Sequence, residues 1–236
     1  MIAPSKKTPL RLLLTLLVFS VLSIAHLQAK EGASKFSCVS WDNLPFTEIL
    51  YRNGTETIPL EIGQGRRAQH YPLGSDGSFE LYVREQSSEG KEELRLIGKA
   101  AFQPGAKQML FLIGLADPKS KLPLVLIGVD DSLSTFPAGS FRFANFTNQP
   151  LKVAFGNVAE TLRPAQIEVY KAKMAPDGGL MSLIVMDSKG KPIFARRLFG
   201  QPRDRSMVFI TPPQTPEGGL SIRILPEIVP EKPDEP

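Results

Sequence analysis

Short stretches in which apolar and polar residues alternate dominate the chain beyond residue 30. The clearest lies at 78–84, where Phe79, Leu81 and Val83 fall on one face and polar or aromatic residues fall between them. A period of two is typical of a strand that buries one face against a core. Helical periodicity is almost absent over the same part of the chain. The pattern therefore predicts an all-β protein.

Turn-forming residues divide these stretches into two series of short strands. Asn53-Gly54, for example, has the composition of a tight hairpin turn. The predicted strands are 36–41, 47–52, 57–62, 78–84, 93–102, 107–115 and 122–129 in the first series, and 140–146, 151–155, 161–163, 167–173, 180–186, 193–198, 207–211 and 220–225 in the second. Seven or eight short strands per series favour two-sheet sandwiches of immunoglobulin-like architecture, with a barrel as the alternative.

The two series resemble each other in sequence. Phe36, Trp41, Asn43 and Pro45 recur as Phe141, Phe146, Asn148 and Pro150, Glu56-Thr57 as Glu160-Thr161, Gln103-Pro104 as Gln201-Pro202, and Met109 and Phe111 as Met207 and Phe209. The spacing between matching residues shrinks along the chain, as expected if loops shortened after a duplication. We therefore predict two tandem sandwich domains that arose by internal duplication.

The chain divides into four predicted segments. Residues 1–29 have the basic start and apolar run of a signal peptide that is removed on export. Residues 30–134 and 135–225 are the two sandwich repeats, joined near Asp130–Gly139. Residues 226–236, rich in proline and acidic side chains, are predicted to be a disordered tail.

Removal of the leader changes the charge of the protein. The whole chain has 28 basic and 24 acidic residues, and three of the basic ones lie in 1–29, which leaves 25 against 24. A nearly neutral chain gives no overall support for nucleic-acid binding, which needs clustered positive charge. The apolar run of the leader is also short for a membrane span, so none is expected after cleavage.

The residues also resemble a known family. A strand ending in Asn-x-Pro (Asn43 to Pro45), a following strand with an Asn-Gly turn, an apolar strand running from Pro104-Gly105 to Gly114, and a strand that closes on Asp130-Asp131 are together similar to a secreted bacterial domain family without an assigned function. The second copy departs from this pattern, with Arg203 in place of Gly105 and Gly156-Asn157 in place of Asn-Gly. The resemblance implies an extracytoplasmic sandwich repeat and no catalytic residue.

Few residues have the chemistry of an active site or a cofactor site. His70 is the one histidine beyond the leader, and no Gly-x-Ser-x-Gly turn accompanies it. Asp130, Asp131 and Ser132 could bind calcium, although they lack the usual calcium-loop spacing. Gly63-Gln64-Gly65 lacks the rest of a dinucleotide loop. Cys38, the single cysteine, is predicted to be a buried thiol. No cofactor or metal is predicted.

A basic cluster in the second repeat is the most suggestive feature. Arg196, Arg197, Arg203 and Arg205 surround a Gln-Pro loop, and guanidinium groups at adjacent strand ends could hold an acidic polysaccharide. The alternative is an ordinary solvated face neutralised by nearby acids. Trp41 and Phe146 could stack on sugars, but their repeated position favours paired core anchors.

These observations predict an exported, non-enzymatic protein of the periplasm, cell surface or medium. It would act as a binding, spacer or assembly module whose partner is an envelope protein or a glycan. The alternatives are an acidic-polysaccharide binder that uses the arginine cluster, and a hydrolase that depends on His70.

Overall fold

A computed structural model describes residues 34–74, 77–102, 105–171, 173, 175, 177–213 and 218–229, and within them every regular element is a strand. The predicted all-β fold is therefore confirmed. The predicted signal segment, 1–29, lies outside the described residues. The first nine strands are β1 (Lys35–Ser40), β2 (Leu50–Asn53), β3 (Glu56–Pro59), β4 (Gly63–Gln64), β5 (Tyr71–Pro72), β6 (Ser78–Gln86), β7 (Glu92–Ala101), β8 (Gln108–Leu115) and β9 (Leu124–Asp130). The other eight are β10 (Ser140–Asn145), β11 (Leu151–Phe155), β12 (Val158–Leu162), β13 (Ile167–Lys171), β14 (Gly179–Met186), β15 (Pro192–Gly200), β16 (Asp204–Thr211) and β17 (Ser221–Ile228).

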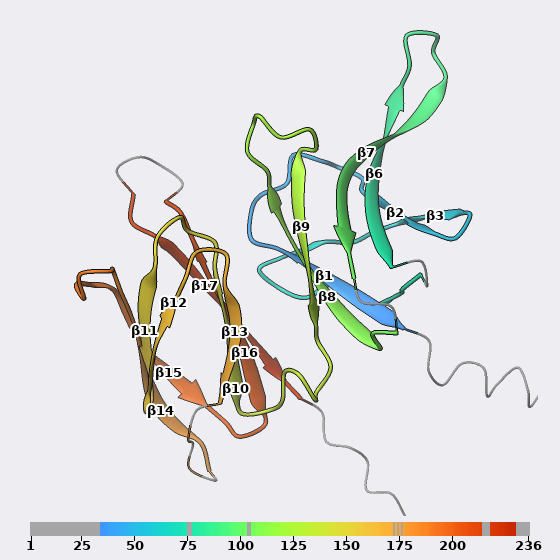
Figure 1. Ribbon diagram of the computed structural model, residues 1–236. Coiled ribbons are helices and arrows are strands. Elements are labelled where there is room, and N and C mark those ends of the chain that lie inside the picture. The colour runs from blue at the N-terminus through green and yellow to red at the C-terminus, as the bar shows by residue number, and fades with distance from the viewer. Residues whose placement is uncertain are drawn as a thin grey trace, which may run out of the picture.

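The strands form four sheets, two in each half of the chain (Figure 1). In the first half, the order β3-β2-β6-β7 makes the first outer sheet, and β4-β1-β8-β9, with β5 beside β1, makes the first inner sheet. In the second half, β13-β10-β16-β17 makes the second inner sheet and β12-β11-β14-β15 the second outer sheet. Apolar side chains fill the space between the two sheets of each half, with Phe79 and Phe111 stacked in the first and Phe143 packed on Phe155 in the second. Each half is thus a β-sandwich.

The two sandwiches have corresponding strand orders, although β5 has no counterpart among the described residues and β4 lies parallel to β1 whereas β13 lies antiparallel to β10. In each, the first strand pairs in parallel with the strand that begins the last hairpin, β1 with β8 and β10 with β16. The last hairpins, β8–β9 and β16–β17, are both antiparallel. This shared order supports the duplication, which stays a prediction.

Two matched pairs in the sequence comparison, Met109 with Met207 and Phe111 with Phe209, are wrong by one residue. Phe36 lies opposite Met109, whereas Phe141, its counterpart, lies opposite Ser206 rather than Met207. Met109 accordingly faces the core of its own sandwich, while Met207 faces away from its own. A slip of one residue in a strand exchanges the two faces, so similar letters in adjacent positions can hide this difference.

A third apolar cluster joins the two sandwiches. Val39, Trp41, Leu110 and Leu112 from the first inner sheet meet Ala144, Met207 and Phe209 from the second. The four central strands β1, β8, β10 and β16 therefore bury both faces, and their residues are almost all buried. The protein is a stack of four sheets with the two outer sheets at its ends, as Figure 1 shows.

Residues at matching positions of the two predicted repeats meet in this interface. The rings of Trp41 and Phe146 stack with their centroids 4.2 Å apart, which confirms the predicted pair of core anchors. Trp41 is only 8% exposed, which leaves no open face for a sugar. Gly114 makes room for its indole, because a Cβ at Gly114 would lie 2.1 Å from the ring. The glycine is therefore required by a close approach and not by a turn.

Several local expectations are also settled. The Asn53-Gly54 turn forms the predicted hairpin between β2 and β3, with Gly54 at φ +61°. The short strands β4 and β5 were not predicted from the sequence. The predicted tail is wrong at its start, because Pro226, Glu227 and Ile228 end β17; residues 230–236 lie outside the described part. Within the described ranges, no helix has the length and apolarity needed to cross a bilayer.

Candidate functional site

Asp131 is the centre of a buried charge network at the junction of the sandwiches. It follows β9 directly, and its side chain is fully buried. Arg67 of the first sandwich donates to it with both terminal nitrogens, one of them at 3.0 Å from Oδ1. Arg142 of β10 and Arg205 of β16, from the second sandwich, approach its two oxygens at 3.5 and 3.2 Å. One carboxylate thus binds guanidinium groups from both halves of the molecule.

Arg205 uses all five of its donors in this network. It donates to Glu227 at 2.8 and 3.1 Å, to the backbone oxygens of Asp131 and Phe136 at 3.0 Å each, and to Oδ2 of Asp131. Glu227, on β17, also pairs with Nε of Arg67 at 2.9 Å. Fully satisfied donors offset the cost of burying a guanidinium group that is only 3% exposed.

Phe136 of the connecting segment separates two of the cations. The guanidinium carbons of Arg142 and Arg205 lie 4.3 and 4.8 Å from the centre of its ring, which is a cation–π arrangement on a side chain 1% exposed. Burial lowers the pKa of Arg142 to about 10, against the opposing effect of Asp131 and with the help of Arg67 and Arg205. Arg142 is still a cation at neutral pH.

These contacts give the junction a structural role. Removing one member would leave buried charges without partners, which makes such networks costly to break. The calcium hypothesis fits the geometry poorly: Asp131 is occupied by arginines, while the carboxylate of Asp130 accepts hydrogen bonds from Ser132 and Thr135 of its own loop. Among the described residues, no group of three or more His, Cys, Asp or Glu is arranged to hold a metal ion.

The predicted arginine cluster does not form as one exposed group. Arg205 is buried in the junction, so the hypothesis that it binds a ligand is wrong. Arg203 is exposed in the loop before β16. Arg196 and Arg197 are exposed on β15, where consecutive residues point to opposite faces of the sheet. Neither forms an ion pair or a hydrogen bond within the described part of the chain.

The β14–β15 hairpin surrounds these two arginines with exposed apolar side chains. Leu180 and Phe199 lie opposite each other on the two strands, and they are 70% and 60% exposed. Ile193, nearer the turn, is 40% exposed. Ile184 and Met186 of β14 are half-buried on the same outward face. Clustered apolar side chains with high exposure mark interaction sites more often than isolated ones do.

A cavity opens beside the same hairpin. It has a volume of about 280 Å³ and is lined by Phe141, Leu198, Phe199, Ile224 and Pro226, together with Arg196. The first sandwich is closed at the corresponding place, because β7 packs on β9 and Gly98 leaves room for Leu126. No comparable contact joins β15 to β17 among the described residues.

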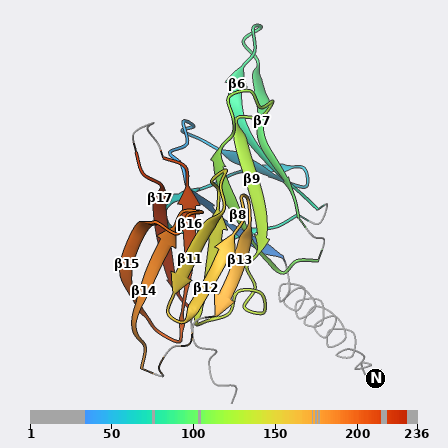
Figure 2. The ribbon, with the colours of Figure 1, turned by 60° about the vertical axis from the view of Figure 1, so that its left-hand side comes forward.

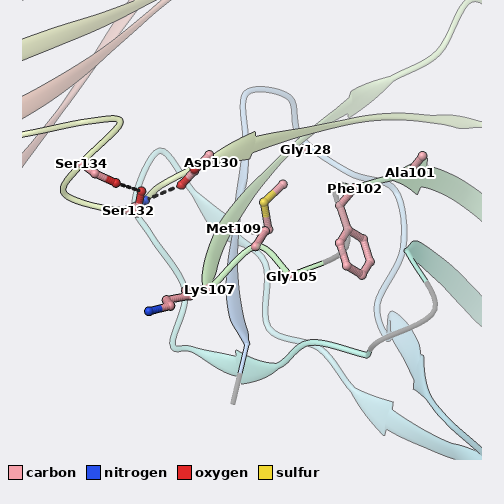
Figure 3. Close-up of a pocket in the computed structure, with 10 residues that line it drawn as sticks. Ala101, Phe102, Gly105, Lys107, Met109, Gly128, Asp130, Ser132 and Ser134 are labelled. Carbon is pink, nitrogen blue, oxygen red and sulfur yellow. Dashed lines mark hydrogen bonds between the residues drawn. The ribbon is translucent and has the colours of Figure 1, made fainter. Parts of the chain in front are cut away.

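A larger cavity, of about 640 Å³, lies at the end of the first sandwich next to the connecting segment (Figure 3). Phe102 and Met109 supply its apolar wall, and Lys107, Asp130, Ser132 and Ser134 its polar wall. The polar groups of the connecting segment already bond one another: the Ser132 amide donates to Asp130, and the hydroxyls of Ser132 and Ser134 lie 2.8 Å apart. Of the two charged side chains in this wall, Asp130 and Lys107, only Lys107 takes no part in these hydrogen bonds. This arrangement selects no particular ligand.

His70 and Cys38 both lack the surroundings of a catalytic group. Burial of its ring and the nearby Lys35 and Arg67 lower the pKa of His70, and within the described residues it has no hydrogen bond to a serine or a carboxylate. Cys38 is fully buried in the first core, as predicted, and burial raises the pKa of its thiol. A buried thiol of raised pKa is a poor nucleophile.

The network itself was not predicted, and neither were Arg67, Arg142 and Glu227 as its members. The position of Arg142 indicated a buried ion pair, because a charged residue at the centre of an apolar strand is buried only when it has a partner. The partners come from three separate segments, and no spacing in the sequence reveals them.

Comparison with known proteins gives no family assignment. No family model matches the chain, and no curated protein is similar enough to count as a relative. The resemblance to a secreted sandwich family therefore stays a prediction that rests on the short motifs alone.

Proposed function

We propose that the protein is an exported, non-enzymatic module of the cell envelope, whose rigid body holds a binding surface at one end. The observation that carries this proposal is the junction between the sandwiches. The stacked inner sheets and the buried network around Asp131 join the two halves through apolar and ionic contacts at once. Since packed sheets lie about 10 Å apart, the backbones of the two outer sheets are separated by about 30 Å.

Two further observations support the proposal. The leader predicted at residues 1–29 supports export. The isolation of His70 and the burial of Cys38 remove the two most reactive side chains of the mature chain from any acid–base or nucleophilic arrangement in the described residues. The exposed apolar side chains and arginines of the β14–β15 hairpin are suited to binding.

Rigidity can be tested by measuring the distance between the two ends. Spin labels on Thr55→Cys and Lys189→Cys would sit on exposed turns of the first and second outer sheets, while native Cys38 is too buried to react. We expect one narrow distance distribution in the mature protein and a broad one after Asp131→Ala. A broad distribution in the unsubstituted protein would contradict the rigid-body proposal, and turnover of substrates in a panel of glycans, esters and peptides would contradict the non-enzymatic one.

A second candidate function is binding of an acidic polysaccharide, which the unpaired guanidinium groups of Arg196 and Arg197 favour. With Arg205 buried, such binding would depend on Arg196, Arg197 and Arg203. Replacing these three with serine should abolish retention on a sulfated or uronic-acid polymer at low salt.

A further inference from the structure

We propose that the open edge of β15 binds an extended, acidic polypeptide segment of a partner protein, which adds to the second outer sheet as a further strand. This inference rests on the proposed function and names the site and the chemistry of the partner.

The first step is the free edge itself. β15 pairs with β14 along its whole length, and within the described residues no strand pairs with its other side (Figure 2). Backbone N–H and C=O groups on such an edge can accept another strand, and this is a common mode of peptide recognition. The neighbouring edge, β17, is less suitable because Pro226 has no N–H to donate.

The second step is the opening next to that edge. The cavity of about 280 Å³ between β15 and the second inner sheet exposes Leu198 and Ile224 to an incoming side chain. A strand that pairs with β15 would direct alternate side chains toward this cavity and toward the outward face, where Phe199 and Leu180 are exposed. Apolar residues on such a strand would therefore be covered on both faces.

The third step is charge. The strands β14 and β15 contain two charged residues, Arg196 and Arg197, and no acidic one. Because β15 sends them to opposite faces, an added strand would meet a guanidinium group on each face. Both lack an ion-pair partner in the described chain, so acidic residues of the partner would gain charge-assisted hydrogen bonds. A polysaccharide could meet the charges but would not supply the backbone ladder or the apolar side chains.

The experiment selects binders of the mature protein from two display libraries of ten-residue peptides. One combines apolar residues with Asp or Glu at randomised positions, so that each face of an added strand can carry both kinds, and the matched library has Lys in place of the acids. We expect enrichment from the acidic library alone, with hydrogen exchange of the β15 amides slowed by the selected peptide and that of the β7 amides unchanged.

Variants connect the binding to the named residues. The double substitution Arg196→Glu with Arg197→Glu should lower the affinity for the selected peptide at least tenfold. Phe199→Ser should have an effect of the same size, and neither variant should lose thermal stability. Lys119→Glu with Lys121→Glu is the matched control, because it makes the same charge change on exposed residues of the first sandwich and should leave affinity unchanged.

Several outcomes would overturn the inference. They are equal enrichment from both libraries, binding that leaves β15 exchange unaltered, self-association of the free protein through β15, or retention on acidic polysaccharide with no peptide selected. None of these bears on the distance measurement across the junction, so the rigid-body proposal is tested separately.

Discussion

The β6–β7 hairpin of the first sandwich and the β14–β15 hairpin of the second occupy the same place in the strand order but present different surfaces. The first carries charges that are paired with one another, such as Arg95 with Glu85 at 2.7 Å and Lys99 with Glu80 at 2.7 Å. The second carries exposed apolar side chains and two unpaired arginines. The first hairpin also closes on β9, while the second leaves a cavity. Corresponding strand order therefore fixes neither the edge nor the face of a sheet.

This difference separates the roles of the two halves. Paired charges on a sheet that is closed at its edge discourage further association, whereas apolar residues beside an open edge permit it. Under the proposed function, recognition therefore belongs to the second sandwich and support to the first.

The two sandwiches can divide their roles in this way only if they form one rigid body. Asp131→Ala is the substitution that should disrupt their junction most strongly. Arg142 would be left buried without the carboxylate it pairs with and Arg205 would keep only Glu227, which should lower the free energy of unfolding by about 3–5 kcal/mol. Chemical denaturation followed by the fluorescence of Trp41, the single tryptophan, measures this at the interface itself. Arg66→Ala is the control, because the side chain of Arg66 is 77% exposed and should contribute almost nothing. Equal stability of the two variants would show that the network does not hold the junction.

Two glycines sharpen the contrast between crowded and open strands. Gly114→Ala would push a Cβ against the ring of Trp41 and should cost about 1–3 kcal/mol. Gly179→Ala, on β14, meets nothing within 4 Å and should change stability by less than about 0.5 kcal/mol. Thermal unfolding of both variants is the measurement, and a larger loss for Gly179→Ala would reverse the comparison.

The smallest expected effect concerns acid. Hydrogen bonds from Lys99 and Tyr82 lower the pKa of Glu80 below its ordinary value of 4.5. A carboxylate with a depressed pKa stabilises the fold above its unfolded-state pKa, and this contribution is lost as the pH falls through the folded-state value. As the pH falls below about 4.5, the free energy of unfolding of the parent protein should therefore decrease by up to about 1 kcal/mol more than that of the Glu80→Gln variant. Urea titrations at several pH values test this, and parallel curves would remove Glu80 from the acid response.

The sequence predicted most strands because their turns and alternation are local properties. Leu151–Phe155 was placed with its exact bounds, and Gly54 marked its hairpin. The apolar cluster between the sandwiches was not predicted, because apolar and polar residues do not alternate in strands that are buried on both faces. The successive apolar residues from Met109 to Ile113 were the available signal, since alternation cannot be satisfied there.

The candidate site was harder to predict than the fold. Arg196 and Arg205 look alike in the sequence, yet one is exposed on an edge and the other is buried between sheets. Their environments depend on which face of a strand meets a neighbouring sheet, and a single residue of register decides it. The opening beside β15 likewise depends on how the two sheets of the second sandwich pack, since β15 has no contact with β17 comparable to that of β7 with β9 among the described residues, and no local pattern encodes it.

The central strands have a consequence for mutational tolerance. With both faces of β1, β8, β10 and β16 buried, these strands offer almost no position where a polar side chain could be accommodated without a partner. Viable change is thereby confined to the outer sheets and loops. New specificities should be obtainable by randomising the outward residues of β14 and β15 while the middle of the stack is left untouched.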